Sequence, residues 1–218
     1  MSLREIEKML DKLGEQLFKI EDMYLVYSEL GLHYNKAVDP KSSEMYLKLI
    51  NLHKGFFIPA QQALRAALTV ELYTYILSKD FLSLQQAITH LKNAENGIDL
   101  LEDYVRIKAR NKNILKHLGK YRNGYYAHKT NATLSKFPNS SDKEFQDLFE
   151  DIKTLLNKAA GHFNKAHWYM EGDSRESIKD THDMMNNLLR GETQRLNEID
   201  VDYVSKLYQS GRDKWMKS

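Results

Sequence analysis

Apolar side chains recur at spacings of three and four residues along most of the chain, which is the period of one face of an α-helix. Residues 3–35 predict a long amphipathic helix, and residues 43–54 predict a shorter one. Gly55 then stands in the usual helix-stop position, and Pro59 suits the first turn of the following helix. We expect the remaining helices over 59–78, from Ser83 to about Ala94, over 98–121 with a kink at 108–113, from the Ser141–Glu144 capping box to about Met170, over 174–197 and over 200–216.

The alternation of apolar and polar residues that marks a strand persists nowhere, and the chain has only three prolines. The pattern therefore predicts an all-α fold, an antiparallel helical bundle with additional long N- and C-terminal helices. We expect residues 43–171 to form its core and the long terminal helices to lie outside it. As domains, we assign residues 1–171 to the bundle with its N-terminal helix, and 172–218 to a C-terminal helical extension that packs on the bundle or on a dimer partner.

Composition removes several classes of protein. The 218 residues include no cysteine, which excludes a disulfide scaffold, a thiolate zinc site and a cysteine nucleophile. No apolar run approaches the ~18 residues of a membrane span, and the charged N-terminus lacks the apolar core of a signal peptide. We expect a cytoplasmic protein with no membrane association.

The net charge of +2 conceals an uneven distribution. Residues 104–141 hold nine Lys and Arg and no Asp or Glu, so the rest of the chain has 23 basic and 30 acidic residues, a net of −7. Such a segment is either a solvated helix face or a surface for the phosphates of a nucleic acid. Lysines recur in it every four residues and would form one stripe on a continuous helix. The candidate RNA-binding residues are Lys108, Lys112, Lys116, Lys120 and Lys129.

The same segment holds residue types that suit RNA cleavage, namely Arg122, Asn123 and His128. Histidine transfers protons near neutral pH, arginine binds phosphate oxygens through a planar fork, and asparagine can orient either neighbour. By spacing alone, a surface arginine and a helix-terminal histidine are the better explanation of the pair. Glu71 lies either on the polar face of its helix or opposite an active-site arginine, and Tyr126 is a second possible supporting residue.

No metal or cofactor is required by this chemistry, and none is expected. The chain contains neither the H-E-x-x-H zinc motif nor a glycine-rich nucleotide loop. Two histidines, His162 and His167, are five residues apart, so they point ~140° apart on a helix.

Three segments in their order along the chain resemble the HEPN superfamily, and most of all its AbiU-type branch, named for abortive phage infection. They are Phe56–Arg65 (FFIPAQQALR), Lys79–Leu84 (KDFLSL) and Arg122–His128 (RNGYYAH), the last matching the R-x(4–6)-H signature of that superfamily. The resemblance covers roughly residues 20–170.

The resemblance implies a four- to five-helix bundle that dimerises so that two Arg/His motifs share one cleft. It implies a metal-independent endoribonuclease that leaves 2′,3′-cyclic phosphate ends and acts as a toxin or phage-defence effector, with an antitoxin or defence-system protein as a possible partner. Some HEPN proteins only bind RNA, a nucleotide or a protein, and a helical scaffold of unrelated function is the remaining alternative.

Helix geometry gives its own reason to expect a homodimer. Arg122 and His128 are six residues apart, so on an unbroken helix they point ~120° away from each other. One chain can hardly close a compact site with them, whereas a two-fold axis doubles each group.

Overall fold

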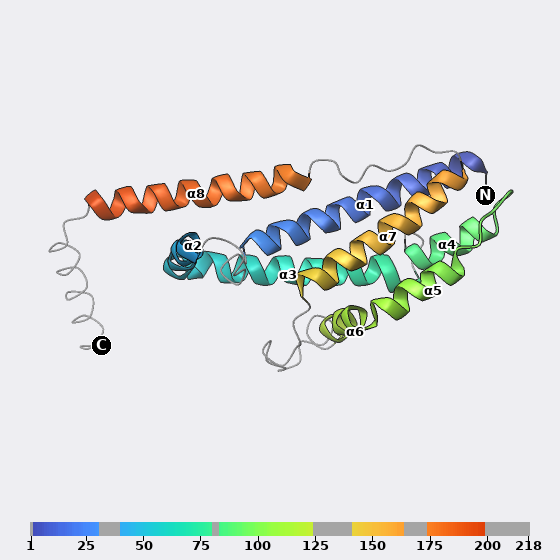
Figure 1. Ribbon diagram of the computed structural model, residues 1–218, viewed down its shortest axis with the longest axis horizontal. Coiled ribbons are helices and arrows are strands. Elements are labelled where there is room, and N and C mark those ends of the chain that lie inside the picture. Colours follow the sequence, from blue (N-terminus) through green and yellow to red (C-terminus); the bar gives the residue numbers. More distant parts are fainter. Residues whose placement is uncertain (1, 31–39, 80–82, 124–140, 164–173, 199–218) are drawn as a thin grey trace, which may run out of the picture.

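The computed structural model describes residues 2–30, 40–79, 83–123, 141–163 and 174–198. Within these ranges the chain is all-α and contains no strand, which confirms the predicted fold class (Figure 1). The helix over residues 3–30 runs antiparallel to the helices over 54–77 and 142–162, as in other antiparallel bundles, and parallel to the helix over 174–198. The helices are α1 (Leu3–Leu30), α2 (Pro40–Leu52), α3 (Lys54–Leu77), α4 (Leu84–Lys92), α5 (Leu101–Arg110), α6 (Lys112–Tyr121), α7 (Asp142–His162) and α8 (Ser174–Glu198).

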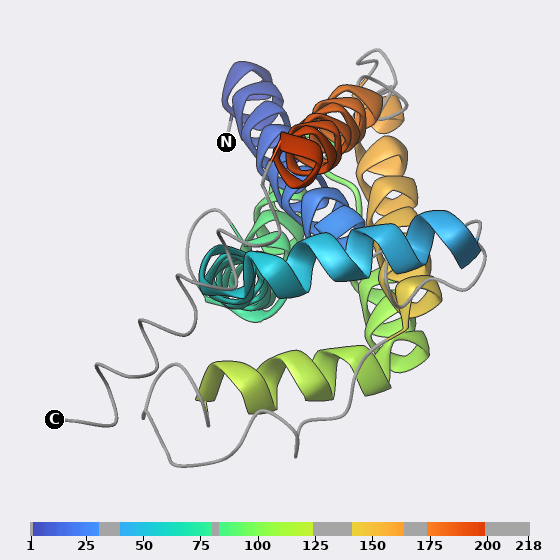
Figure 2. The same cartoon turned by 90° about the vertical axis from the view of Figure 1, so that its left-hand side faces the viewer.

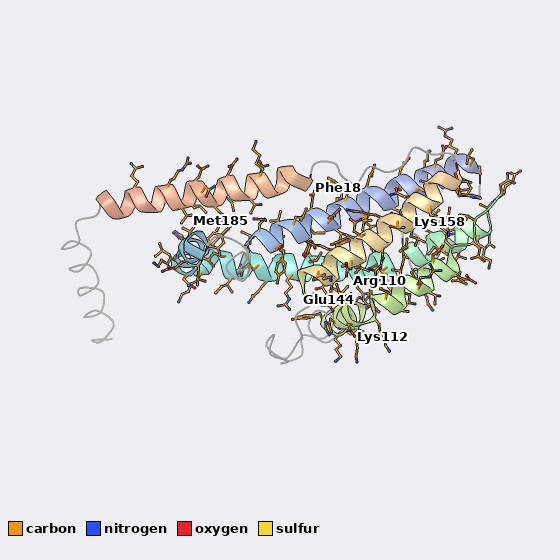
Figure 3. The ribbon with its side chains drawn as sticks, viewed as in Figure 1. Phe18, Arg110, Lys112, Glu144, Lys158 and Met185 are labelled. Atoms are coloured by element: carbon orange, nitrogen blue, oxygen red, sulfur yellow. The ribbon has the colours of Figure 1, made fainter. Side chains whose placement is uncertain are left out.

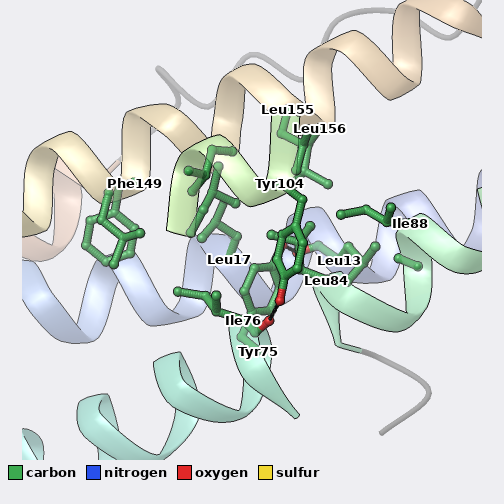
Figure 4. Close-up of a cluster of buried hydrophobic side chains, with 14 of the residues drawn as sticks. Leu13, Leu17, Tyr75, Ile76, Leu84, Ile88, Tyr104, Phe149, Leu155 and Leu156 are labelled. Carbon is green, nitrogen blue, oxygen red and sulfur yellow. Dashed lines mark hydrogen bonds between the residues drawn. The ribbon is translucent and has the colours of Figure 1, made fainter. Parts of the chain in front are cut away.

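The N-terminal helix lies at the centre of the bundle, and our expectation that it lies outside was wrong. One face of α1 is buried along most of its length and packs against α3, α4 and α7. Leu13 and Leu17 are fully buried there, beside Tyr75 and Phe149 (Figure 4). The Tyr75 hydroxyl donates a hydrogen bond to the Leu13 carbonyl over 3.1 Å. Because α1 covers both α3 and α7, it is part of the core.

Two predicted helix starts are confirmed by their caps. The Ser83 hydroxyl accepts a hydrogen bond from the Gln86 N–H at 3.2 Å at the start of α4. At the start of α7, Ser141 and Glu144 form both halves of a capping box. The end of α7 was predicted wrongly, since the helix stops at His162 and not near Met170. The Phe163 N–H bonds to the Ala160 carbonyl there, which tightens the last turn.

The junction between α2 and α3 also differs from the prediction. Gly55 lies in the first turn of α3 and does not stop a helix, and Pro59 is the sixth residue of α3, beyond its first turn. Phe57 explains the early start, because it is 1% exposed in a second, smaller core with Leu30 and Met185. The turn before Pro59 carries this ring.

The last described helix, α8, lies along α1 and crosses α2 (Figure 1 and Figure 2). Its Met185 is buried in the smaller core, together with residues of α1, α2 and α3. Residues 199–218, where we expect a further helix, are outside the described residues. The division of the chain at residue 171 stays a prediction.

The expected kink within 98–121 is confirmed as a break at Asn111. This side chain is 6% exposed, and its Nδ2 donates to the Ile107 carbonyl at 3.0 Å and to Asp151 Oδ2 of α7 at 2.7 Å. The backbone leaves the helical region there, at φ −97° and ψ 21°. After the break, α6 runs crosswise below the other helices and does not continue the axis of α5 (Figure 2).

Candidate functional site

Helices α3 and α6 position the start of the Arg/Asn/His segment. One face of α6 is buried, with Leu118 and Tyr121 at its C-terminal end. Gly119 faces α3, where a Cβ at this position would lie 3.4 Å from Tyr73 Cε2, in van der Waals contact. The packing of α6 therefore fixes where Arg122 leaves the helix.

Arg122 and Asn123 form an exposed pair at the C-terminal end of α6. Arg122 has helical dihedral angles, φ −55° and ψ −50°, and the two residues continue the helix as a wider turn. The Arg122 guanidinium carbon lies 4.9 Å from the centre of the Tyr73 ring. Its Nη1 donates to Asn123 Oδ1 over 3.1 Å. Since a guanidinium has five N–H donors, most of them stay available to a phosphate.

A second arginine and tyrosine pair connects the same two helices. The Arg65 guanidinium of α3 lies 4.5 Å from the centre of the Tyr121 ring and donates a hydrogen bond to its hydroxyl. Burial raises the pKa of Tyr121, the positive charge of Arg65 opposes that rise, and nearby Tyr27 adds to it. Two arginine–tyrosine pairs therefore join α3 to the C-terminal end of α6, Arg65 with Tyr121 and Tyr73 with Arg122.

Sequence reasoning did not assign Arg65 or Tyr73 to the site. Arg65 served only as the last residue of a segment that resembles HEPN proteins, and Tyr73 was not singled out. The available signal was an arginine inside the most apolar helix, followed two turns later by a tyrosine, which places both near one face. Thr69 lies between them, and its hydroxyl donates to the Arg65 carbonyl at 2.8 Å.

The row of lysines is divided by the break at Asn111, so the continuous helix on which they would form one stripe is not present. Lys112, Lys116 and Lys120 lie on α6, and all three are exposed. Lys108 lies on α5, with its ammonium 5.1 Å from the centre of the Tyr104 ring. Only the three α6 lysines therefore share one helix face with a spacing of ~6 Å per step.

The cations of α5 and α6 differ in their partners. Arg110 Nη1 lies 2.7 Å from Asp151 Oδ1 of α7, and Arg106 lies 3.6 Å from Asp103. None of the three α6 lysines forms an ion pair with any residue in the described ranges. Figure 3 shows Lys112 pointing outward from α6 and Arg110 lying near α7. Among the described residues, the cations of α6 thus differ from the two arginines of α5 in having no acidic partner.

The structure does not place the remaining predicted site residues beside Arg122. Glu71 is exposed on α3, ~200° around the helix from Tyr73, so within one chain it lies on a different face from the ring beneath Arg122. His128, Tyr126 and Lys129 lie outside the described residues, and so does the geometry between Arg122 and His128.

Histidines and acidic residues do not gather elsewhere in the part of the chain that the structure describes. No three His, Asp or Glu side chains there converge as the ligands of a metal ion would. His162 lies at the end of α7, with Nε2 2.8 Å from the Asn96 carbonyl oxygen.

An all-α bundle with an Arg–Asn pair closing a basic helix corresponds to the class that the sequence resembles. The HEPN family model described as AbiU2 matches residues 3–189, and the chain belongs to this family. No curated protein and no solved structure matches the chain. None of the described helices has the combination of length and apolar character that a membrane span requires.

Proposed function

We propose that this protein is a metal-independent endoribonuclease of the HEPN type, acting as a toxin or phage-defence effector. The observation that carries the proposal is the exposed Arg122–Asn123 pair at the end of a helix whose three lysines have no acidic partner among the described residues. Such a surface suits a polyanion, because each phosphate contact releases counterions.

The proposed reaction assigns one task to each residue type. The 2′-hydroxyl of a nucleotide attacks its own phosphorus, the bond to the 5′-oxygen of the next nucleotide breaks, and a 2′,3′-cyclic phosphate and a 5′-hydroxyl form. His128 transfers protons in this exchange. Arg122 stabilises the charge on the equatorial phosphate oxygens, and Asn123, which accepts a hydrogen bond from Arg122, orients the guanidinium.

We propose that the complete site forms in a homodimer, with Arg122, Asn123 and His128 of both chains near the two-fold axis. The exposure of Arg122 supports this, since a second chain can reach it. We also propose an antitoxin or another defence-system protein as a partner. Static light scattering at micromolar concentration should give a dimer, and a strict monomer would contradict the composite site.

RNA cleavage in the presence of EDTA tests the function. The wild type should cleave a single-stranded RNA under these conditions, and H128A should lose cleavage while keeping its melting temperature. K48Q, which breaks an exposed ion pair with Glu44 on α2, is the matched surface control and should cleave at the wild-type rate. Activity that requires added Mg²⁺ or Mn²⁺ would contradict the mechanism.

The alternative is a non-catalytic HEPN module that binds RNA, a nucleotide or a protein partner. The same α6 surface supports RNA binding without cleavage. Retained RNA affinity in both wild type and H128A, with no cleavage by either, would favour this alternative.

A further inference from the structure

We propose that Tyr73 is a positioning residue for Arg122, an inference that rests on the proposed function. The Tyr73 ring of α3 fixes the plane of the Arg122 guanidinium, and Asn123 fixes its rotation within that plane. The remaining N–H donors are thereby held outward, where a phosphodiester can bind.

The contacts of the ring support the first part of this proposal. Its centre is 4.9 Å from the Arg122 guanidinium carbon, within the ~6 Å range of a cation–π contact. The ring is partly buried and packs against the main core, and its Cε2 lies against Gly119 in the last turn of α6. The core on one side and α6 on the other therefore hold the ring in place.

Asn123 supports the second part. Its Oδ1 accepts one Nη1–H of Arg122 over 3.1 Å, which leaves four of the five N–H donors unused by this contact. No carboxylate pairs with Arg122 among the residues that the structure describes. The partners of this guanidinium are a ring face and an amide oxygen, and neither competes as an anion with phosphate.

The Arg65–Tyr121 pair holds Arg122 and the Tyr73 ring in their relative positions. It lies between the same two helices, and Tyr121 directly precedes Arg122 in the chain. Because the pair ties the last turn of α6 to α3, the Arg122 backbone stays above the Tyr73 ring.

Two substitutions separate positioning from folding. Y73L removes the aromatic face and keeps an apolar side chain, and we expect the single-turnover cleavage rate to fall about tenfold, with RNA affinity within about twofold of wild type. Y73F keeps the ring and should recover most of the rate. A merely structural role would instead lower the melting temperature and leave the rate of the folded enzyme unchanged.

A second measurement does not depend on cleavage. Ring-current shielding should move the Arg122 Nε–H resonance of wild type and Y73F upfield, with R122Q assigning the signal, and Y73L should lose this shift. A single-stranded DNA oligonucleotide has phosphodiesters but no attacking 2′-hydroxyl. On its addition the Arg122 signal should move in wild type and Y73F, and much less in Y73L.

The outcomes are distinguishable. An unshifted Arg122 signal in wild type, or an equal response to DNA in Y73L, would overturn the role of Tyr73. A wild type that cleaves no RNA would overturn the ribonuclease function alone, because the DNA response still judges the positioning of Arg122.

Discussion

Two consecutive helices of ten residues, α5 and α6, carry most of the positive charge of the basic segment but differ in how that charge is compensated. Asp103 and Asp151 pair with the arginines of α5. The lysines of α6 have no such partners in the part of the chain that the structure describes. The count of basic residues in the sequence does not distinguish these helices, whereas their surroundings do.

The cause of the difference is the break at Asn111. Before it, α5 packs on α7, which carries Asp151. After it, α6 packs on α3, and the Arg65–Tyr121 and Tyr73–Arg122 pairs that join these helices contain no acidic residue. A basic segment thus contributes to the fold through α5 and, as we propose, to RNA binding through α6.

The largest expected effect is on the cleavage rate, and it distinguishes Arg122 from Arg110. R122A should lower the single-turnover cleavage rate roughly 100- to 1000-fold, because one fixed donor to the transition-state charge is lost, while RNA affinity falls modestly. R110A removes an arginine of α5 that is engaged with Asp151, and it should leave the rate near wild type. Similar losses of rate in both variants would remove the proposed distinction between the helices.

The break at Asn111 between α5 and α6 should contribute to the stability of the fold. N111A removes the donor to Ile107 and Asp151 from a buried position, and we expect the free energy of unfolding in urea to fall by about 1–3 kcal/mol. N113A is the matched control two residues later, where the side chain is exposed, and should change stability by less than ~0.5 kcal/mol. Equal stability of the two variants would show that the break does not depend on this hydrogen bonding.

Two double variants with the same change in net charge test whether the α6 lysines bind RNA. K112Q/K116Q should weaken RNA binding and flatten the slope of log affinity against log salt by roughly 0.7 per lost contact. R106Q/R110Q alters cations that already have acidic partners, so the slope should change much less. Filter binding across a salt series measures both. An unchanged slope in K112Q/K116Q would mean that α6 is a solvated face.

The smallest expected effect is a loss of folding stability at alkaline pH. Burial raises the pKa of Tyr104 of α5 to about 12, against about 10 for an unfolded chain. Between these values the unfolded state has lost a proton that the folded state keeps, so stability falls as pH rises from about 10 to 12. Buried Tyr75, whose pKa burial also raises, adds to this loss. Urea titrations of Y104F should therefore show a shallower decline with pH than wild type, and parallel declines would contradict the assignment.

The pKa of Tyr121, the last residue of α6, is raised less than burial alone would raise it, because Arg65 of α3 lies beside its hydroxyl. Burial raises the pKa of Tyr121, but the adjacent guanidinium favours the phenolate. Tyrosinate absorbance should consequently report Tyr121 ionising at a lower pH in wild type than in R65Q.

Local patterns predicted much of this molecule correctly. The helical periodicity and the caps at Ser83 and Ser141 depend on bonds that span three or four residues. The break between 108 and 113 was predicted from the thin apolar support of that stretch. The segment around Arg122 also led to the HEPN family, to which the chain belongs. These features are visible in the sequence because each is encoded within one or two helical turns.

Contacts between distant residues account for what the sequence did not reveal. The burial of α1 at the centre and the early start of α3 around Phe57 depend on helices that meet only after folding. Lys153 contacts Glu21 across 132 positions, and Asn111 contacts Asp151 across 40. The placement of Tyr73 beneath Arg122 is of the same kind. Periodicity shows that a helix has a buried face, but the partner of that face is set by packing between helices, and this packing decides which cations are neutralised and which face solvent.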